Sequence, residues 1–189
     1  MDKSQLRHRY LSNRQSLTRF QVQSRNQLIS QRLINYVSWT DLNLVHFYLP
    51  IVRNQEIDTF PIIEYLRKHY PAVRIAVPKV VQEHTLDHYL LTDRTKLELN
   101  LWGIPEPANA TAIPLDQIDL VVTPMVIFDR AGHRVGYGKG YYDRFLAKCR
   151  PDTRKIGLCY FEPVEQIDFE STDIAMDVVV TPDGIWEFE

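Results

Sequence analysis

The chain has 189 residues, with 22 basic and 24 acidic side chains, a formal net charge of −2 and 44% hydrophobic content. These values fit one globular domain, residues 1–189, with a core of its own. No apolar run reaches the length of a transmembrane helix, and no signal-peptide pattern is present. The two cysteines, Cys149 and Cys159, are too few for a disulfide or metal framework, so we expect reduced thiols in a cytoplasmic protein.

Charge is unevenly distributed along the chain. Within positions 1–32 only Asp2 opposes the basic residues Lys3, Arg7, Arg9, Arg14, Arg19, Arg25 and Arg32, and no Lys or Arg follows Phe161. A basic arm is one sign of nucleic-acid binding, but the nearly neutral total and the lack of interleaved aromatic residues argue against it. A polyanionic small ligand accounts for the arm equally well. We expect a monomer with neither a nucleic-acid nor a membrane partner.

Hydrophobic periodicity predicts alternating helices and strands in the first half of the chain. Helical spacing in residues 3–37 predicts two helices, the second of which is capped by Ser16 or Thr18. The same spacing predicts a further helix over residues 56–69. Pro61 is compatible with that last helix only in its first turn. Strands are predicted at residues 43–49 and 74–78, and a hairpin-like insertion at residues 80–101.

The second half contains a buried strand at residues 120–122, a helix from Tyr141 with Lys148 and Arg150 in its last turn, and strands at residues 155–160 and 176–181. Apolar strands separated by amphipathic helices predict an α/β three-layer sandwich, in which a mostly parallel sheet lies between helical layers.

A glycine triplet, Gly136, Gly138 and Gly140, stands directly before the predicted helix. Glycines at a helix start let backbone N–H groups approach a ligand, and this arrangement favours a bound phosphate over an ordinary tight turn. It is not a Walker A loop, because Lys139 is followed by glycine, nor is it the Rossmann fingerprint. Asp143, in the first helical turn, suits either the helix N-terminus or Mg²⁺.

The stretch VTPMVIFDRAGHRVGYGKGYYDRFL closely resembles the signature of the 5-formyltetrahydrofolate cyclo-ligase family, P-x-x-x-F-D-x-x-G-x-R-x-G-x-G-x-G-Y-Y-D. The matching positions are Pro124, Phe128, Asp129, Gly132, Arg134, Gly136, Gly138, Gly140, Tyr141, Tyr142 and Asp143. Lys139 departs from the glycine that many members carry. Near the N-terminus, Lys3-Ser-Gln-Leu6-Arg7 reproduces the K-x-x-L-R with which members begin.

The resemblance implies ATP-dependent cyclisation of 5-formyltetrahydrofolate to 5,10-methenyltetrahydrofolate, with Mg²⁺ as cofactor and ADP and phosphate as products. It also implies a fold related to sugar-phosphate isomerases and CoA-transferases. Catalytic roles fall on Arg134 and Lys139. The implied ATP contacts are Lys3, Arg7, Arg134, Val135, Gly136, Tyr137, Gly138, Lys139, Gly140, Tyr141 and Tyr142.

For the folate, the resemblance implies contacts from Leu49, Glu56, Trp102, Tyr137, Gly138, Lys139, Gly140 and Tyr141. Taken alone, Glu56 also suits a helix N-terminus, and Trp102 also suits the core. The metal ligands implied are Asp143 and Asp177, the latter in the family's D-x-V-x-T pattern. Two other classes of function remain open. One is a non-catalytic folate- or nucleotide-binding regulator, and the other is a sugar-phosphate enzyme that needs neither the basic N-terminal pair nor the two magnesium carboxylates.

Overall fold

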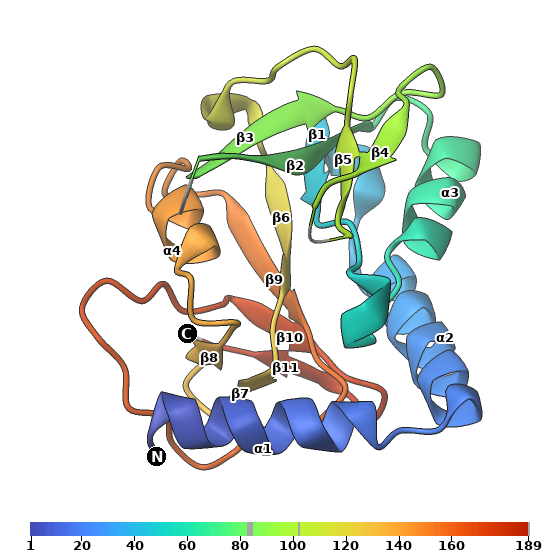
Figure 1. Ribbon diagram of the computed structural model, residues 1–189. Helices are drawn as coiled ribbons and strands as arrows, with labels where there is room; N and C mark the ends of the chain where they lie inside the picture. The colour runs from blue at the N-terminus through green and yellow to red at the C-terminus, as the bar shows by residue number, and fades with distance from the viewer. Residues whose placement is uncertain (83–84, 102, 189) are drawn as a thin grey trace.

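The computed structural model describes residues 1–82, 85–101 and 103–188 as a mixed α/β fold (Figure 1). The helices are α1 (Lys3–Gln15), α2 (Arg19–Tyr36), α3 (Phe60–His69) and α4 (Tyr141–Leu146). The strands are β1 (Leu44–Phe47), β2 (Arg74–Gln82), β3 (Thr85–Leu90), β4 (Leu97–Leu99), β5 (Pro105–Pro107), β6 (Leu120–Pro124), β7 (Ile127–Phe128), β8 (Arg134–Val135), β9 (Arg154–Leu158), β10 (Val178–Val180) and β11 (Ile185–Glu187).

Seven of the described strands form the central sheet, in the order β11-β10-β9-β6-β1-β2-β3. The inner strands β10, β9, β6, β1 and β2 pair in parallel, whereas the edge strands β11 and β3 are antiparallel to their neighbours. The prediction of a mostly parallel sheet is therefore confirmed. The hairpins β4-β5 and β7-β8 lie outside this sheet.

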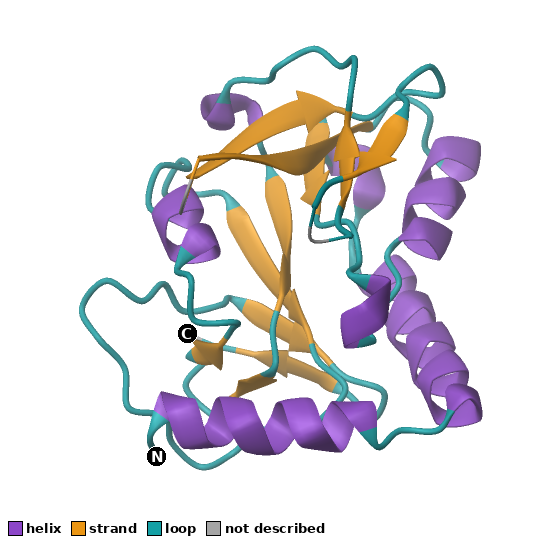
Figure 2. Cartoon of the chain, viewed as in Figure 1, coloured by secondary structure: helices purple, strands orange, loops and turns teal. Residues whose placement is uncertain are grey.

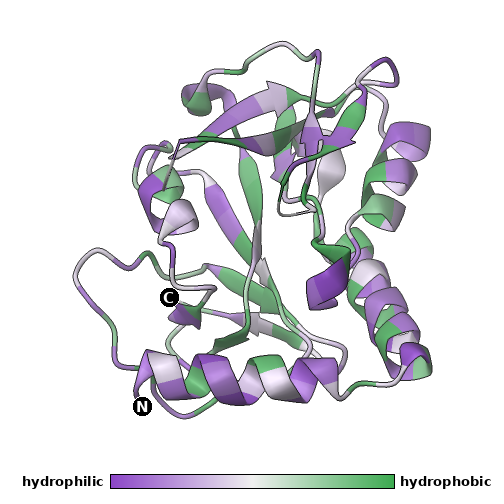
Figure 3. Cartoon of the chain, in the orientation of Figure 1, coloured by the Kyte–Doolittle hydropathy of each residue, from purple (hydrophilic) through white to green (hydrophobic). Residues whose placement is uncertain are grey.

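Alternate residues of each strand face opposite sides of the sheet. Leu120 and Val122 of β6 belong to a buried cluster with α2 and α3, whereas Val121 belongs to a second cluster with Leu6 of α1 and Phe145 of α4. Figure 2 shows α2 and α3 on the side of the sheet opposite to α4. The hydrophobic residues concentrate along the central strands (Figure 3). These layers confirm the three-layer sandwich.

Local signals in the sequence explain where the helices begin. Thr18 caps α2 in a reciprocal capping box with Gln21, and Pro61 lies in the first turn of α3 as expected. None of the helices in the described residues has the length and apolarity needed to cross a membrane.

The end of α4 differs from the sequence prediction. The helix stops at Leu146, so Lys148 and Arg150 lie beyond it instead of in its last turn. Arg150 directly precedes Pro151, and a proline disfavours the helical conformation for the residue before it. The Arg150 guanidinium pairs with Asp119, 3.0 Å from its carboxylate, and so connects this segment to the start of β6.

The β7-β8 hairpin, absent from the sequence prediction, occupies the long loop between β6 and α4. Its turn is organised by Asp129, whose buried carboxylate accepts hydrogen bonds from the backbone N–H groups of Ala131, His133 and Ile167 at 2.9–3.0 Å. Helix α1 packs against this hairpin. The hairpin therefore places the glycine loop, residues 136–140, between α1 and α4.

Candidate functional site

The site lies where the strand order reverses. From β1 the chain continues outward to β2 on one side, while β6, β9 and β10 follow on the other. Open α/β sheets bind ligands at such a switch point, at the carboxyl ends of the strands. A cleft of about 1230 Å³ opens there, lined by Tyr48 and Leu49 after β1 and by Pro124 at the end of β6. Because single-ligand pockets have about 300–1,000 Å³, the cleft has room for two ligands.

The glycine loop forms one wall of this cleft, and α1 lies directly against it. Gly138 and Gly140 adopt positive φ angles of 86° and 62°, which glycine reaches without strain. A Cβ at Gly138 would lie 3.1 Å from Cζ of Arg7, so a larger residue would crowd that side chain. Arg7 Nε donates a hydrogen bond to the Gly136 carbonyl oxygen at 2.7 Å. The loop conformation and the place of Arg7 therefore depend on each other.

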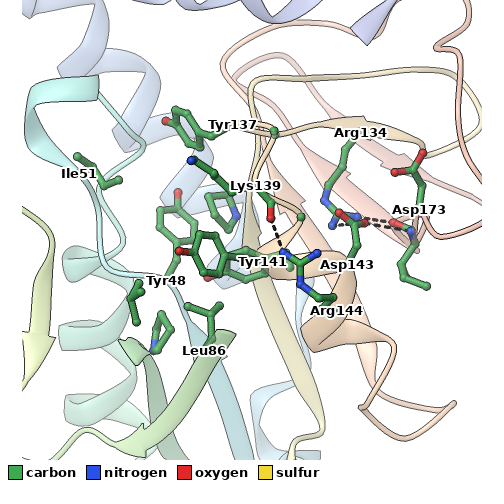
Figure 4. Close-up of a pocket in the computed structure, with 18 of the residues that line it drawn as sticks. Tyr48, Ile51, Leu86, Arg134, Tyr137, Lys139, Tyr141, Asp143, Arg144 and Asp173 are labelled. Atoms are coloured by element: carbon green, nitrogen blue, oxygen red, sulfur yellow. Dashed lines mark hydrogen bonds and ion pairs between the residues drawn. The ribbon is translucent and has the colours of Figure 1, made fainter. Parts of the chain in front are cut away.

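One end of the cleft holds cations that are already paired with carboxylates (Figure 4). Arg134 Nη2 lies 2.7 Å from Asp143 Oδ1, and its Nη1 donates to the Ile174 carbonyl oxygen. Lys3, from α1, pairs with Asp173. Asp143 also accepts from the Ile174 backbone N–H at 3.1 Å. This end can exchange its carboxylates for phosphate oxygens without leaving a buried charge alone.

The other end of the cleft is aromatic and contains Glu56, which is 8% exposed. Its carboxylate accepts from the Ile51 backbone N–H at 2.7 Å and from the Tyr137 hydroxyl. Burial raises the pKa of Glu56, while these two hydrogen bonds and the charge of Arg14 act in the opposite direction. In Figure 4, Tyr48, Ile51 and Tyr137 lie on the opposite side from Arg134, Asp143 and Asp173, with Lys139 and Tyr141 between the two groups.

Most residues expected at a site do line this one cleft. They are Lys3, Arg7, Leu49, Glu56, Arg134, Gly136, Tyr137, Gly138, Lys139, Gly140, Tyr141, Tyr142 and Asp143. The Tyr142 hydroxyl is buried and has no hydrogen-bond partner in the described part of the chain, and burial raises its pKa. A bound ligand with a polar atom at that point would satisfy it.

Among the described residues, two that were expected at the site, Val135 and Asp177, do not line the cleft. Val135 is fully buried in β8, and its carbonyl oxygen accepts from the Val126 backbone N–H at 2.8 Å, so it faces the core. Trp102 lies outside the described residues. Asp177 requires a correction, since it pairs with Lys155 instead of joining Asp143: its carboxylate accepts from the Lys155 backbone N–H at 2.6 Å and lies 2.9 Å from Nζ. It directly precedes β10, at the amino ends of parallel strands, whereas the cleft lies at their carboxyl ends.

Sequence reasoning missed two important residues. Asp173 lines the cleft four positions before Asp177, but nothing in the local sequence separates these acids. Arg14 contacts the Tyr137 hydroxyl, and here a signal did exist. It follows Arg7 by seven residues, two helical turns, and therefore projects from the same face of α1.

Fold and cleft together define a doubly wound α/β protein whose ligand site lies at the switch point of its sheet. A family model of the 5-formyltetrahydrofolate cyclo-ligase family matches residues 1–182. The 5-formyltetrahydrofolate cyclo-ligase of Escherichia coli is 31% identical, with 93% of this chain and 97% of the relative covered. The probable 5-formyltetrahydrofolate cyclo-ligase of Schizosaccharomyces pombe is 27% identical, with 98% and 97% covered.

The solved structures agree with this result. The NMR structure of Aquifex aeolicus 5,10-methenyltetrahydrofolate synthetase matches with a TM-score of 0.85 at 28% identity, covering 99% of this chain and 93% of that one. The chain belongs to the 5-formyltetrahydrofolate cyclo-ligase family and is an enzyme. The resemblance read from the glycine-rich signature is thereby confirmed.

Proposed function

We propose that this enzyme uses ATP to cyclise 5-formyltetrahydrofolate to 5,10-methenyltetrahydrofolate, with release of ADP and phosphate. Family membership supports the reaction. The observation that carries it in this chain is the glycine loop, which lies between a cationic end of the cleft and an aromatic end. A triphosphate at the first end and a pterin at the second would meet at Lys139 and Tyr141.

The chemistry needs the formyl oxygen to become a leaving group. The amide oxygen attacks the γ-phosphorus, the bond between the β–γ bridging oxygen and the γ-phosphorus breaks, and ADP leaves. N10 then attacks the formyl carbon, the carbon–oxygen bond breaks with release of phosphate, and N10 loses its proton. Catalysis is mainly positioning and charge neutralisation, as in other phosphoryl transfers. A general base from the protein is not required.

The phosphates are bound by Lys3, Arg7 and Arg134 together with the backbone of the glycine loop. Arg7 already lies on the loop through its hydrogen bond to Gly136. Lys3 and Arg134 exchange their carboxylate partners for phosphate oxygens when the triphosphate enters. Lys139, between the two ends of the cleft, neutralises the transferred phosphoryl group.

Mg²⁺ fits the carboxylates that these cations release. Asp143 and Asp173 line the same cleft, and carboxylate oxygens are the ligands this hard cation prefers. No group of three metal-ligating side chains occurs among the described residues, so phosphate oxygens and water would complete the coordination. Held by Asp143 and Asp173, Mg²⁺ would neutralise negative charge on the phosphates. Asp173 replaces Asp177 in this assignment.

The folate is bound at the aromatic end. The Glu56 carboxylate accepts the adjacent N–H donors of the pterin ring, an interaction that carboxylates make with good geometry. Leu49 and Tyr48 provide apolar surface for the ring, and Tyr141 lies between the pterin and the phosphates.

The test mixes purified protein with 5-formyltetrahydrofolate, Mg²⁺ and ATP and follows the absorbance of the methenyl product. We expect a rise that depends on ATP and that is strongly reduced in Glu56→Gln. A flat trace with folded protein rejects the proposed reaction. Tight binding of folate or nucleotide without turnover would indicate a regulator, and turnover of a sugar phosphate without ATP would indicate the other class of enzyme.

A further inference from the structure

A buried arginine lies behind the aromatic end of the cleft. Arg14, near the end of α1, is only 1% exposed. Its Nη1 donates to the Tyr137 hydroxyl at 2.8 Å, its Nη2 donates to the Met125 carbonyl oxygen, and its guanidinium lies 5.8 Å from the ring centroid of Tyr160. Burying a charge is costly unless it is paired. Nε remains without a hydrogen-bond partner within the described residues, so the surroundings of Arg14 do not satisfy all of its hydrogen-bond donors.

Tyr137 connects this arginine to Glu56. Its hydroxyl accepts from Arg14 and donates to the Glu56 carboxylate, so positive charge, hydroxyl and carboxylate follow one another in a chain. The Ile51 backbone N–H approaches Oε2 of the same carboxylate at 2.7 Å. Two donors from different segments fix the rotation of the carboxylate, and its remaining lone pairs are available to a ligand.

We propose that Arg14, acting through Tyr137, is a positioning residue that keeps Glu56 ionised and directed into the cleft, so that the enzyme selects ligands with paired N–H donors such as a pterin. The inference rests on the proposed function, because it takes the pterin as the ligand of Glu56. Arg14 itself does not touch the folate. Its effect reaches the substrate through one hydroxyl and one carboxylate.

The charges around Glu56 support this role. Three tyrosines face it: Tyr48 directly after β1, Tyr142 in α4 and Tyr160 in the segment that follows β9. Burial raises the pKa of each, so they are neutral at ordinary pH. Arg53 and Lys139 line the same cleft. Burial raises the pKa of Glu56. The Tyr137 hydrogen bond opposes that rise more strongly than the charge of Arg14 does.

This arrangement predicts how binding changes with pH. Without the Tyr137 hydroxyl or the Arg14 charge, the pKa of Glu56 rises further, so the carboxylate is protonated at a higher pH. A protonated Glu56 no longer accepts two N–H donors. As the pH is lowered, the variants therefore lose folate binding at a higher pH than the wild type does. If Arg14 only held α1 against Met125, replacing it would lower thermal stability without moving this pH limit.

The experiment measures the dissociation constant of 5-formyltetrahydrofolate by equilibrium dialysis from pH 5 to pH 8 with the full chain. For Tyr137→Phe and Arg14→Met, we expect binding weakened about tenfold near neutral pH, as for loss of a hydrogen bond to a charged group. The lower pH limit of binding moves upward in both variants. The KM for ATP stays within about twofold in Arg14→Met, because Arg14 does not line the cleft in which the phosphates bind. Tyr10→Phe and Arg9→Met, on the same helix but outside the cleft, are the matched controls.

A double-mutant cycle separates positioning from packing. In a Glu56→Gln background, Tyr137→Phe should leave the pH limit unchanged, because the group that it adjusts is gone. If Arg14→Met does not fold, the measurement on Tyr137→Phe decides between positioning and packing. Unchanged folate affinity and pH limit in folded Tyr137→Phe overturn the inference while leaving the reaction intact. A wild-type protein that binds no 5-formyltetrahydrofolate overturns the proposed function and the inference together.

Discussion

Arg7 donates from Nε to the carbonyl oxygen of Gly136 across 2.7 Å, which connects residues 129 positions apart in the chain. The absence of a side chain at Gly138 makes room for this contact, because a Cβ there would lie 3.1 Å from Cζ of Arg7. The first helix therefore forms part of the wall of the cleft, and its place against the loop is set by an arginine that also lines the cleft.

Replacing Arg7 by alanine should raise the KM for ATP about tenfold or more, because the variant loses a charged contact to phosphate and the support of the loop. Steady-state kinetics at saturating 5-formyltetrahydrofolate measures the change. Arg9→Ala, an exposed arginine on the same helix, is the control and should match the wild type. An unchanged KM for ATP in folded Arg7→Ala would remove Arg7 from the nucleotide site.

The glycine-rich signature also contains a structural part, represented by Gly132. This residue has a φ of 82°, and a Cβ there would lie 2.8 Å from the Met176 carbonyl oxygen. Gly132→Ala should lower the free energy of unfolding by about 2 kcal/mol or more, through backbone strain and a contact with main chain that cannot move easily. Denaturant titration measures it. Gly184→Ala is the control: nothing lies within 4 Å of its added Cβ, and its stability should stay near that of the wild type.

Stability should also fall in mild acid because of a buried histidine pair. His88 Nδ1 lies 3.0 Å from His46 Nε2, and burial lowers the pKa of His88 from 6.5 to about 4, with Lys148 acting in the same direction. Burial likewise lowers the pKa of His46. Between these pKa values the unfolded chain binds a proton that the folded chain does not. The free energy of unfolding therefore decreases as pH falls from 7 to 5, by about 2 kcal/mol for His88 alone.

Urea unfolding at pH 7 and pH 5 tests this, with His88→Asn as the variant and exposed His8→Asn as the control. The drop in stability between the two pH values should be smaller in His88→Asn and unchanged in His8→Asn. An equally steep drop in His88→Asn would show that other groups cause the acid sensitivity.

The sequence predicted what depends on local patterns. Periodicity located the long helices and the parallel strands, Thr18 and Pro61 indicated where helices begin, and the glycine triplet located the loop at the cleft. It did not reveal the β7-β8 hairpin, because strands of two residues leave no periodic signal. For the same reason Val135 was expected at the ligand site, although its place in the hairpin buries it.

The error at Asp177 has a different cause. A D-x-V-x-T pattern shows which acid precedes a strand, but not how the preceding segment crosses the sheet. In the fold Asp173 meets Lys3, 170 positions away, and faces the cleft, whereas Asp177 pairs with Lys155 across neighbouring strands. Only the tertiary contact with α1 distinguishes the two acids.

This distinction gives a direct test of the metal assignment. Asp173→Asn should raise the Mg²⁺ concentration needed for half-maximal activity, and should weaken Mn²⁺ binding in the presence of a non-hydrolysable ATP analogue, because one carboxylate ligand is lost. Asp177→Asn should leave both quantities unchanged. It should lower stability by about 1 kcal/mol or less, since its ion pair is partly exposed, with 41% of the Asp177 side chain accessible. If Asp177→Asn shifts the metal requirement while Asp173→Asn does not, the carboxylate partner of Asp143 has been assigned to the wrong residue, and the segment before β10 must bind the nucleotide in another arrangement.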